Sequence, residues 1–194
     1  MSAIDRRIEP RYASFRGWVR LRLANAEFRA GRLKRFASID FSKVERLVFV
    51  CQGNICRSSF AEFVARRSGV STASFGLQAA TGERAFPRAI ATATAFGIDL
   101  DRHRVTDIAD FEFRSGDLLA TMEVRQARRL SSIVADPGVQ ITLVGLWSTP
   151  FRPHIHDPYE HSDAYFATCF RTLQSGVHGL VSRWRPDMAR EVSD

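Results

Sequence analysis

The chain has 194 residues, of which 45% are hydrophobic, 25% charged and 11% aromatic. This composition is typical of a globular protein with one core and excludes a disordered or fibrous chain. No apolar run is long enough to cross a bilayer, and three cysteines without an apolar segment near the start support neither a disulfide framework nor a signal peptide. We therefore expect a soluble, cytoplasmic protein.

The net charge of +7 is concentrated at the start of the chain. Residues 1–43 contain 11 Lys and Arg against four Asp and Glu, whereas residues 44–194 contain 17 basic and 17 acidic residues. We predict a basic helical N-terminal extension at 1–43 and a globular domain at 44–194. No nucleic-acid-binding motif accompanies the basic residues, so we expect no nucleic-acid partner.

Apolar residues of the extension recur at helical spacing and predict one amphipathic face. Two interpretations of this face stay open. It packs on the rest of the protein, or the basic helix makes peripheral contact with an anionic membrane or docks a partner. The predicted face consists of Phe15, Trp18, Val19, Leu23, Ala26, Ala30, Leu33 and Ala37.

From residue 46 onward, short apolar runs alternate with segments of helical pattern. Strands are predicted at 46–51, 71–75, 117–122 and 140–145, and helices at 58–69, 87–96, 123–132 and 161–184. The first strand is a continuous apolar run, typical of a strand buried on both faces of a parallel sheet. The alternation predicts an α/β fold, a three-layer α/β/α sandwich with a four-stranded parallel sheet.

The loop VCQGNICRSS contains the main chemical signal. Cys51 ends the first strand and Arg57 follows six residues later, at the start of a helix. Backbone N–H groups of such a loop, the helix N-terminus and a forked Arg can bind a tetrahedral oxyanion such as phosphate. Gly53 permits the tight turn. The same positive surroundings favour the thiolate of Cys51, which is a nucleophile.

At these residues the chain resembles the low-molecular-weight protein tyrosine phosphatases, whose loop usually reads V-C-x-G-N-I-C-R-S-P. Ser59 replaces the usual proline, a change that leaves the phosphate-binding groups in place. The resemblance covers roughly residues 44–186. It implies that Asp157 of the DPY motif is the general acid, which protonates the leaving tyrosine oxygen, and that Tyr159 forms an aromatic wall of the pocket.

The resemblance also implies supporting roles. Cys56 resembles a second cysteine that traps an oxidised nucleophile as a reversible disulfide. Ser74 and His103 match outlying members of a polar network that holds the loop. Alternatives from the residues alone are a strand-edge hydroxyl for Ser74, a surface histidine for His103 and an N-cap for Ser58. The implied phosphate-binding residues are Gln52, Gly53, Asn54, Ile55, Cys56 and Ser58.

Two features are predicted to have no catalytic role. Cys169 lies in an apolar helical stretch and is expected in the core. His154 and His156 precede Asp157, but this spacing without further ligands is a weak metal signal. We therefore expect no metal and no cofactor.

The resemblance implies a metal-independent protein-tyrosine phosphatase that works through a phosphocysteine. The segments at 77–87 and 121–130 look like those of bacterial members associated with capsule and exopolysaccharide export, which act on tyrosine kinases. Arsenate reduction is an alternative, but residues 121–140 lack the cysteine pair it uses. A phosphotyrosine-binding module without turnover is a second alternative. The physiological substrate and the oligomeric state stay open.

Overall fold

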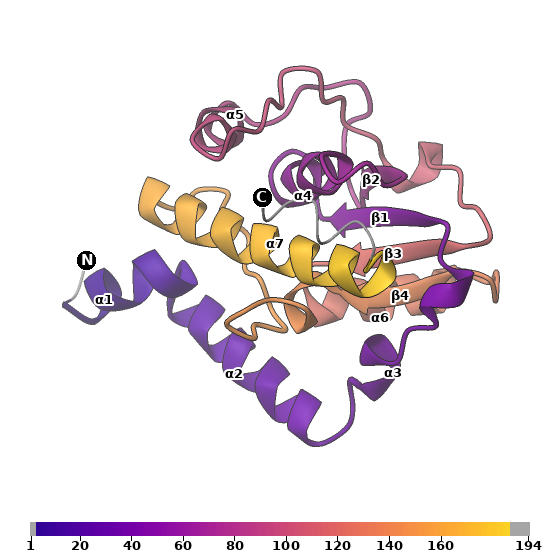
Figure 1. Ribbon diagram of the computed structural model, residues 1–194. Helices are drawn as coiled ribbons and strands as arrows, with labels where there is room; N and C mark the ends of the chain where they lie inside the picture. The colour runs from indigo at the N-terminus through magenta and orange to yellow at the C-terminus, as the bar shows by residue number, and fades with distance from the viewer. Residues whose placement is uncertain (1–2, 187–194) are drawn as a thin grey trace.

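A computed structural model describes residues 3–186 and contains a central sheet with helices on both faces (Figure 1). The strands are β1 (Arg46–Cys51), β2 (Thr72–Gly76), β3 (Asp117–Thr121) and β4 (Gln140–Leu143). They lie in the order β2-β1-β3-β4, and all neighbouring pairs are parallel. The predicted four-stranded parallel sheet is confirmed.

The central strands are buried on both faces because their side chains alternate between two layers of the core. Leu47 and Phe49 of β1 belong to the apolar cluster that includes α4 and α7, whereas Val48 and Val50 belong to the cluster that includes Leu130 of α6. All four side chains are buried. The continuous apolar run therefore has a partner on each side.

The helices of the domain are α4 (Arg57–Arg66), α5 (Pro87–Thr94), α6 (Val124–Ile133) and α7 (Asp163–Trp184). α4, α5 and α7 share one apolar cluster, where Phe60 stacks on Phe170 with ring centroids 3.9 Å apart. α6 covers the opposite face. Short 3-10 helices occupy Phe41–Lys43, Ile108–Asp110 and Val144–Leu146. The three-layer α/β/α arrangement predicted from the alternation is confirmed.

The topology brings the ends of β1 and β3 together at one edge of the sheet. The chain leaves β1 toward β2 on one side and later returns to β3 on the other. In parallel sheets, ligands bind outside the carboxyl ends of the strands at such a reversal. The loop after Cys51 begins at this edge and leads directly into α4.

The N-terminal extension forms three helices rather than one. These are α1 (Ala3–Tyr12), α2 (Phe15–Arg29) and α3 (Lys34–Ala37). The chain turns between α2 and α3 at Gly31, whose φ of 74° is favourable for glycine. In Figure 1, α1 lies beside α7, α2 runs from α1 away from α7, and α3 lies near β4.

The extension packs on the domain through a different face from the one predicted. Gly17, Leu21 and Ala24 are the buried residues of α2, whereas Phe15 and Leu23 are 59% and 60% exposed. At 3.6 residues per turn, the buried residues lie about 180° around the helix from the predicted face. Position 17 needs glycine, because a Cβ there would lie 2.0 Å from the Tyr12 carbonyl oxygen of α1 and 3.1 Å from the His156 ring of the domain.

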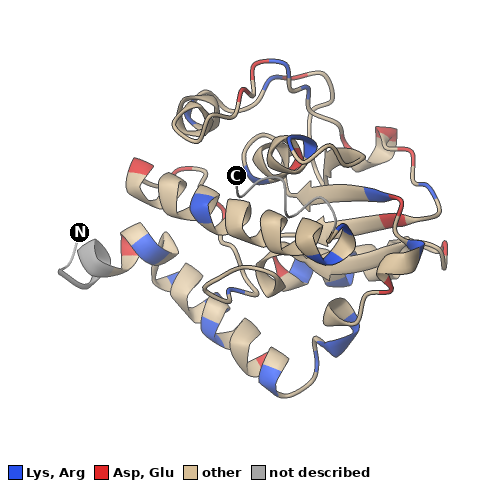
Figure 2. Cartoon of the chain, viewed as in Figure 1, with Lys and Arg blue, Asp and Glu red and all other residues tan. Residues whose placement is uncertain are grey.

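Beyond α2, the structure agrees with the packing interpretation at Leu33, a residue of the predicted face. Leu33 and Phe36 are buried in a cluster with Val124, Ala127 and Leu143. Apart from the half-buried Arg20, the basic residues of α2 and α3 are exposed. Figure 2 shows Lys and Arg along both helices. Between residues 3 and 186, no helix has the length and apolar character needed to span a membrane.

Candidate active site

The thiol of Cys51 lies at the carboxyl end of β1, inside a loop that supplies hydrogen bonds to sulfur. The Cys51 Sγ is 3.0 Å from the Ser58 Oγ and 3.2 Å from the Asn54 backbone nitrogen, which donates to it. Ser58 lies in the first turn of α4, and the N-cap position belongs to Cys56. The N-cap alternative for Ser58 is therefore wrong.

Asn54 organises the loop. Its φ of 55° is tolerated by asparagine. Its side-chain nitrogen donates to Ser58 and Ser74, each at 2.8 Å, and its side-chain oxygen accepts from the Thr106 backbone at 2.9 Å. The His103 Nε2 lies 2.8 Å from the Asn54 carbonyl oxygen. The loop is thus held from β2 and from the segment at 103–106.

The supporting residues Ser74 and His103 are both buried. The alternative of a surface histidine for His103 is therefore wrong. Burial lowers the pKa of His103, which favours a neutral ring that donates to Asn54. Ser74 donates to Glu62 at 2.5 Å, and Glu62 also pairs with Arg66. Glu62 was not expected at the site from the sequence.

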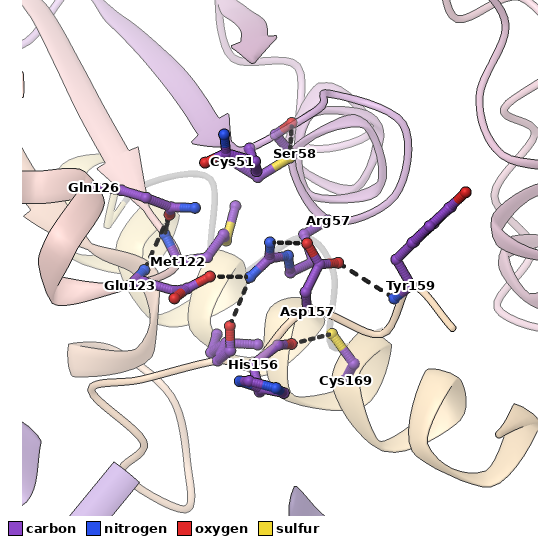
Figure 3. Close-up of polar contacts among 12 residues, drawn as sticks. Cys51, Arg57, Ser58, Met122, Glu123, Gln126, His156, Asp157, Tyr159 and Cys169 are labelled. Carbon is purple, nitrogen blue, oxygen red and sulfur yellow. Dashed lines mark hydrogen bonds and ion pairs between the residues drawn. The ribbon is translucent and has the colours of Figure 1, made fainter. Parts of the chain in front are cut away.

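Arg57 is completely buried and points toward two carboxylates (Figure 3). Its Nη1 donates to Glu123 Oε1 and to the Ile155 carbonyl oxygen, both at 2.9 Å, and its Nη2 donates to Asp157 Oδ2 at 2.5 Å. Burial opposes its charge, but Asp157 and Glu123 outweigh burial and raise the pKa of Arg57. Within residues 3–186 its Nε has no hydrogen-bond partner, so this nitrogen can donate to an anion.

Glu123 is the main residue that the sequence analysis missed. It follows β3 and precedes α6, and it is buried against Arg57. Burial disfavours its charge, but Arg57 and a hydrogen bond from Arg125 overcome this and lower the pKa of Glu123 to about 2. Arg20 of α2 lies 3.6 Å from the same carboxylate. The topology offered a signal, since Glu123 follows a strand that ends at the same edge as Cys51.

Asp157 reaches the site from the segment before α7. The Ile155 backbone nitrogen bonds to the Met122 carbonyl oxygen at 2.9 Å, which ties this segment to the end of β3. The Asp157 side chain is 36% exposed, and its Oδ1 accepts from the Tyr159 nitrogen at 3.3 Å. Asp157 is therefore both paired with Arg57 and open to solvent.

Tyr159 and Phe86 form an aromatic pair at the exposed side of the site. Their ring centroids are 4.9 Å apart, and Tyr159 is 44% exposed. The Phe86 nitrogen bonds to the Ile55 carbonyl oxygen at 2.9 Å, which joins the pair to the loop. Phe86 is a second residue that the sequence analysis missed. The pair can contact the ring of an aromatic substrate.

The remaining loop residues differ in exposure. Gln52 is half-buried, and its side-chain nitrogen lies 3.2 Å from the Gln78 side-chain oxygen. Gly53 is half-buried as well. Cys56 is buried, and burial raises the pKa of its thiol. Cys169 of α7 lies in the hydrophobic core, where burial raises the pKa of its thiol too.

His154 and His156 lie beside the site as neutral rings. Burial lowers the pKa of each to about 4. The His154 Nε2 and the His156 Nδ1 are 3.5 Å apart. Among the residues that the structure describes, no three His, Cys, Asp or Glu side chains gather as a metal site would require.

The arrangement combines a nucleophile, a cation and a carboxylate from distant parts of the chain. Cys51 ends β1, Arg57 begins α4 and Asp157 precedes α7. A thiolate, a forked cation and a proton donor are the groups needed to displace a phosphoryl group from an oxygen.

Comparisons with known proteins agree with this chemistry. The profile of the family described as low molecular weight phosphotyrosine protein phosphatase matches residues 46–192. The low molecular weight protein-tyrosine-phosphatase Wzb of Escherichia coli K12 is 34% identical over 130 residues, which cover 66% of this chain and 87% of Wzb. The probable low molecular weight protein-tyrosine-phosphatase EpsP of Ralstonia nicotianae is 30% identical over 144 residues, which cover 73% of this chain and 97% of EpsP.

Solved structures show the same fold. The tyrosine phosphatase Wzb from Escherichia coli K30, in complex with sulphate, superposes with a TM-score of 0.62 at 29% identity and covers 75% of this chain and 99% of its own. The Erwinia amylovora tyrosine phosphatase amsI gives a TM-score of 0.63 at 26% identity, over 72% of this chain and 93% of its own.

Proposed function

Because the chain belongs to the low-molecular-weight phosphotyrosine protein phosphatase family, we propose that it hydrolyses phosphotyrosine on proteins, with Cys51 as nucleophile, Arg57 as phosphate clamp and Asp157 as general acid. The main support is the contact between Arg57 Nη2 and Asp157 Oδ2 at 2.5 Å. This contact joins the loop after Cys51 to a carboxylate 100 residues away.

In the first half-reaction, the Cys51 thiolate attacks phosphorus, a sulfur–phosphorus bond forms and the bond to the tyrosine oxygen breaks. The incoming phosphate competes with Asp157 for Arg57, whose unpartnered Nε is a ready donor. Negative charge on the phosphate favours the protonated form of Asp157. Asp157 then gives its proton to the leaving oxygen.

In the second half-reaction, water attacks the phosphocysteine. Asp157, now ionised, takes a proton from the water, the sulfur–phosphorus bond breaks and phosphate leaves with the thiolate restored. Glu123 stays ionised throughout, since its pKa of about 2 lies well below neutrality. It holds the Nη1 side of Arg57 while the Nη2 side exchanges partners.

The direct test is turnover of para-nitrophenyl phosphate by the purified protein in the presence of chelator. We expect metal-independent hydrolysis with a bell-shaped pH profile on the acid side of neutrality, because Cys51 must be ionised and Asp157 protonated. Cys51→Ser should abolish turnover while vanadate or phosphate still binds. Binding of a phosphotyrosine peptide without turnover by the unsubstituted protein would favour the non-catalytic alternative.

We further propose that the substrate is a bacterial tyrosine kinase of exopolysaccharide export. The support is the resemblance of the segments at 77–87 and 121–130 to that branch of the family. The test is dephosphorylation of the tyrosine kinase encoded nearest to this chain in its genome, followed by mass spectrometry. Retention of all its phosphotyrosines, while para-nitrophenyl phosphate is hydrolysed, would reject this substrate.

We also propose that α2 makes peripheral contact with an anionic membrane. The side chains of Phe15 and Leu23 are exposed, and Trp18 stacks on Phe15 with ring centroids 5.5 Å apart. Leu23 also lies at the edge of a pocket between α2 and α6. The exposed Arg16 and Arg22 accompany them. An apolar strip beside Arg residues is suited to the interface of a bilayer with anionic headgroups.

The membrane proposal is tested by sedimentation with vesicles of phosphatidylcholine, with and without phosphatidylglycerol. We expect binding only to the anionic vesicles, with release as salt rises. The double variant Phe15→Ser/Leu23→Ser should lose binding. Ile133→Ser is the matched control, because Ile133 is similarly exposed on α6. Equal binding by the double variant and the control would reject contact through α2.

A further inference from the structure

A pocket of about 290 Å³ lies beside the catalytic loop and has no role in the chemistry described above. It is lined by Gln52, Leu77, Arg125, Gln126 and Arg129. We refer to it as the Gln126 pocket. Gln52 directly follows Cys51, so the pocket adjoins the position of the reacting phosphate. Its lining contains two arginines and no carboxylate, which suits an anion.

Gln126 of the pocket lining has an unused hydrogen-bond donor. Its side chain is buried, and its Oε1 accepts from the backbone nitrogens of Met122 at 3.0 Å and Glu123 at 3.1 Å. These two bonds fix the orientation of the amide, because a flipped amide would place its NH2 group against two N–H donors. In the described part of the chain, the Nε2 has no partner. In Figure 3 this nitrogen points to the side where Cys51 lies.

An unsatisfied buried donor costs about 1–3 kcal/mol, so a ligand atom that accepts from it is favoured. Among the described residues, two buried side-chain nitrogens lack a partner, namely Gln126 Nε2 and Arg57 Nε. The Arg57 nitrogen faces the reacting phosphate in the proposed mechanism. The Gln126 nitrogen therefore indicates that the substrate carries a second hydrogen-bond acceptor near the reacting phosphate.

The arginines of the pocket supply positive charge. Arg129 is exposed and has no carboxylate within 4 Å among the described residues. Arg125 is also exposed, and it reaches Glu123 with its Nε at 2.8 Å. Both belong to α6.

We propose that the Gln126 pocket binds an anionic side chain next to the phosphotyrosine of the substrate, with Gln126 and Arg129 as its specificity-determining residues. The ligand chemistry is a carboxylate of Asp or Glu, or the phosphate of a second phosphorylated residue. This inference rests on the proposed phosphotyrosine hydrolysis and adds a preference for phosphotyrosines in acidic or multiply phosphorylated sequences.

The test compares phosphotyrosine peptides that differ at one position beside the phosphotyrosine, in one series before it and one after it. That position carries Gln, Glu or phosphonomethylphenylalanine, a phosphotyrosine mimic that cannot be hydrolysed. We expect kcat/KM to be about fivefold higher for the Glu peptide than for its Gln isostere, the effect of about 1 kcal/mol from one charge pair. A larger gain for the phosphonate alone would identify phosphate as the preferred ligand.

Two variants assign the preference to the pocket. Arg129→Gln should reduce the ratio of kcat/KM between the anionic and the neutral peptides toward one. Gln126→Met should do the same; it removes the free donor at similar volume, together with the acceptor of the Met122 and Glu123 backbone nitrogens. Arg171→Gln is the matched control, because it removes an exposed arginine from α7, outside the pocket, and should keep the ratio. Equal kcat/KM for Gln and Glu peptides in the unsubstituted protein, or a ratio unchanged in both pocket variants, would overturn the proposal.

The binding affinity of the same peptides for the Cys51→Ser protein separates this proposal from the proposed function. If no substrate is turned over but the Glu peptide binds more tightly through Arg129, the pocket is correct and the hydrolysis is wrong. If the Gln peptide is hydrolysed and no anionic preference exists in affinity or rate, the hydrolysis is correct and the pocket is wrong.

Discussion

The proton donor is the residue whose role can be tested most directly. Asp157→Ala removes the group that protonates the leaving oxygen, so substrates with basic leaving groups should suffer most. We expect kcat on phenyl phosphate to fall by about 100-fold or more, and kcat on para-nitrophenyl phosphate to fall less, because para-nitrophenolate leaves without a proton. Equal losses on the two substrates would remove Asp157 from the acid role and leave it as a partner of Arg57.

Oxidation tests the second thiol of the loop. Peroxide converts the Cys51 thiolate to a sulfenic acid, and attack by the Cys56 sulfur then forms a disulfide and releases water. Burial raises the pKa of Cys56, so this step should be slow at neutral pH and faster at alkaline pH. We expect reversible inactivation, with a Cys51–Cys56 disulfide detected by mass spectrometry. If Cys56→Ala regains activity with thiol as fully as the unsubstituted protein, Cys56 does not protect the nucleophile.

At the residue scale, sequence spacing predicted the residues of the loop better than the residues that contact the loop from other parts of the chain. Cys51 and Arg57 are six residues apart on a strand and a helix, so local geometry alone places them at one loop. The resemblance supplied Asp157, which local spacing could not connect to the loop across 100 residues. Glu123 stayed undetected because its contact with Arg57 depends on β3 lying beside β1, and an acidic residue at a strand end has many other uses.

At the element scale, the close approach of α1 and α2 gives a prediction. A Cβ at position 17 would lie 2.0 Å from the Tyr12 carbonyl oxygen and 3.1 Å from the His156 ring. Gly17→Ala should therefore lower the free energy of unfolding by about 1–3 kcal/mol, measured by urea denaturation. Ala26→Ser, on the exposed side of α2, is the control and should change stability little. A Gly17→Ala protein as stable as the control would show that α2 can shift without cost.

The same helix explains why one sequence-based expectation was wrong. Hydrophobic periodicity selected Phe15, Trp18 and Leu23 because they are large and correctly spaced. The domain instead receives Gly17, Leu21 and Ala24, of which two are too small to mark a face by hydrophobicity. Close approach to a neighbouring segment favours small side chains, and periodicity gives them little weight. The strands were predicted well because a sheet buried on both faces needs continuous apolar runs.

At the scale of the whole molecule, stability should fall in acid. The pKa of His154 is lowered by burial from 6.5 to about 4, so the unfolded chain binds a proton before the folded one. The neutral His154 ring therefore contributes to the free energy of unfolding above pH 6.5. This contribution is lost as pH falls from about 6.5 to 4. The total loss is about 3 kcal/mol at about 1.4 kcal/mol per pKa unit. His154→Gln should show a smaller loss between pH 7 and pH 4 in urea unfolding, and parallel pH curves would contradict this.

We expect the stability of the catalytic domain to depend on the N-terminal extension. The segment packs through buried Leu21, Leu33 and Phe36, and its Phe36 carbonyl oxygen accepts a 2.7 Å hydrogen bond from the buried Thr142 hydroxyl. Deleting residues 1–43 would expose the apolar surface these side chains cover and leave that hydroxyl without its acceptor.

We expect the deletion to lower the melting temperature by about 5 °C or more, since each kcal/mol corresponds to about 2–4 °C in a chain of this size. Dye binding should report new apolar surface. The Phe15→Ser/Leu23→Ser protein is the matched comparison, because its substitutions lie on the exposed side of α2 and should leave the melting temperature nearly unchanged. If the deletion protein has the same melting temperature as the full chain, the extension contributes no stability. Its membrane contact then becomes the main reason for its presence. If both variants melt early, Phe15 and Leu23 contribute to the packing, and loss of vesicle binding by that variant no longer isolates a lipid contact.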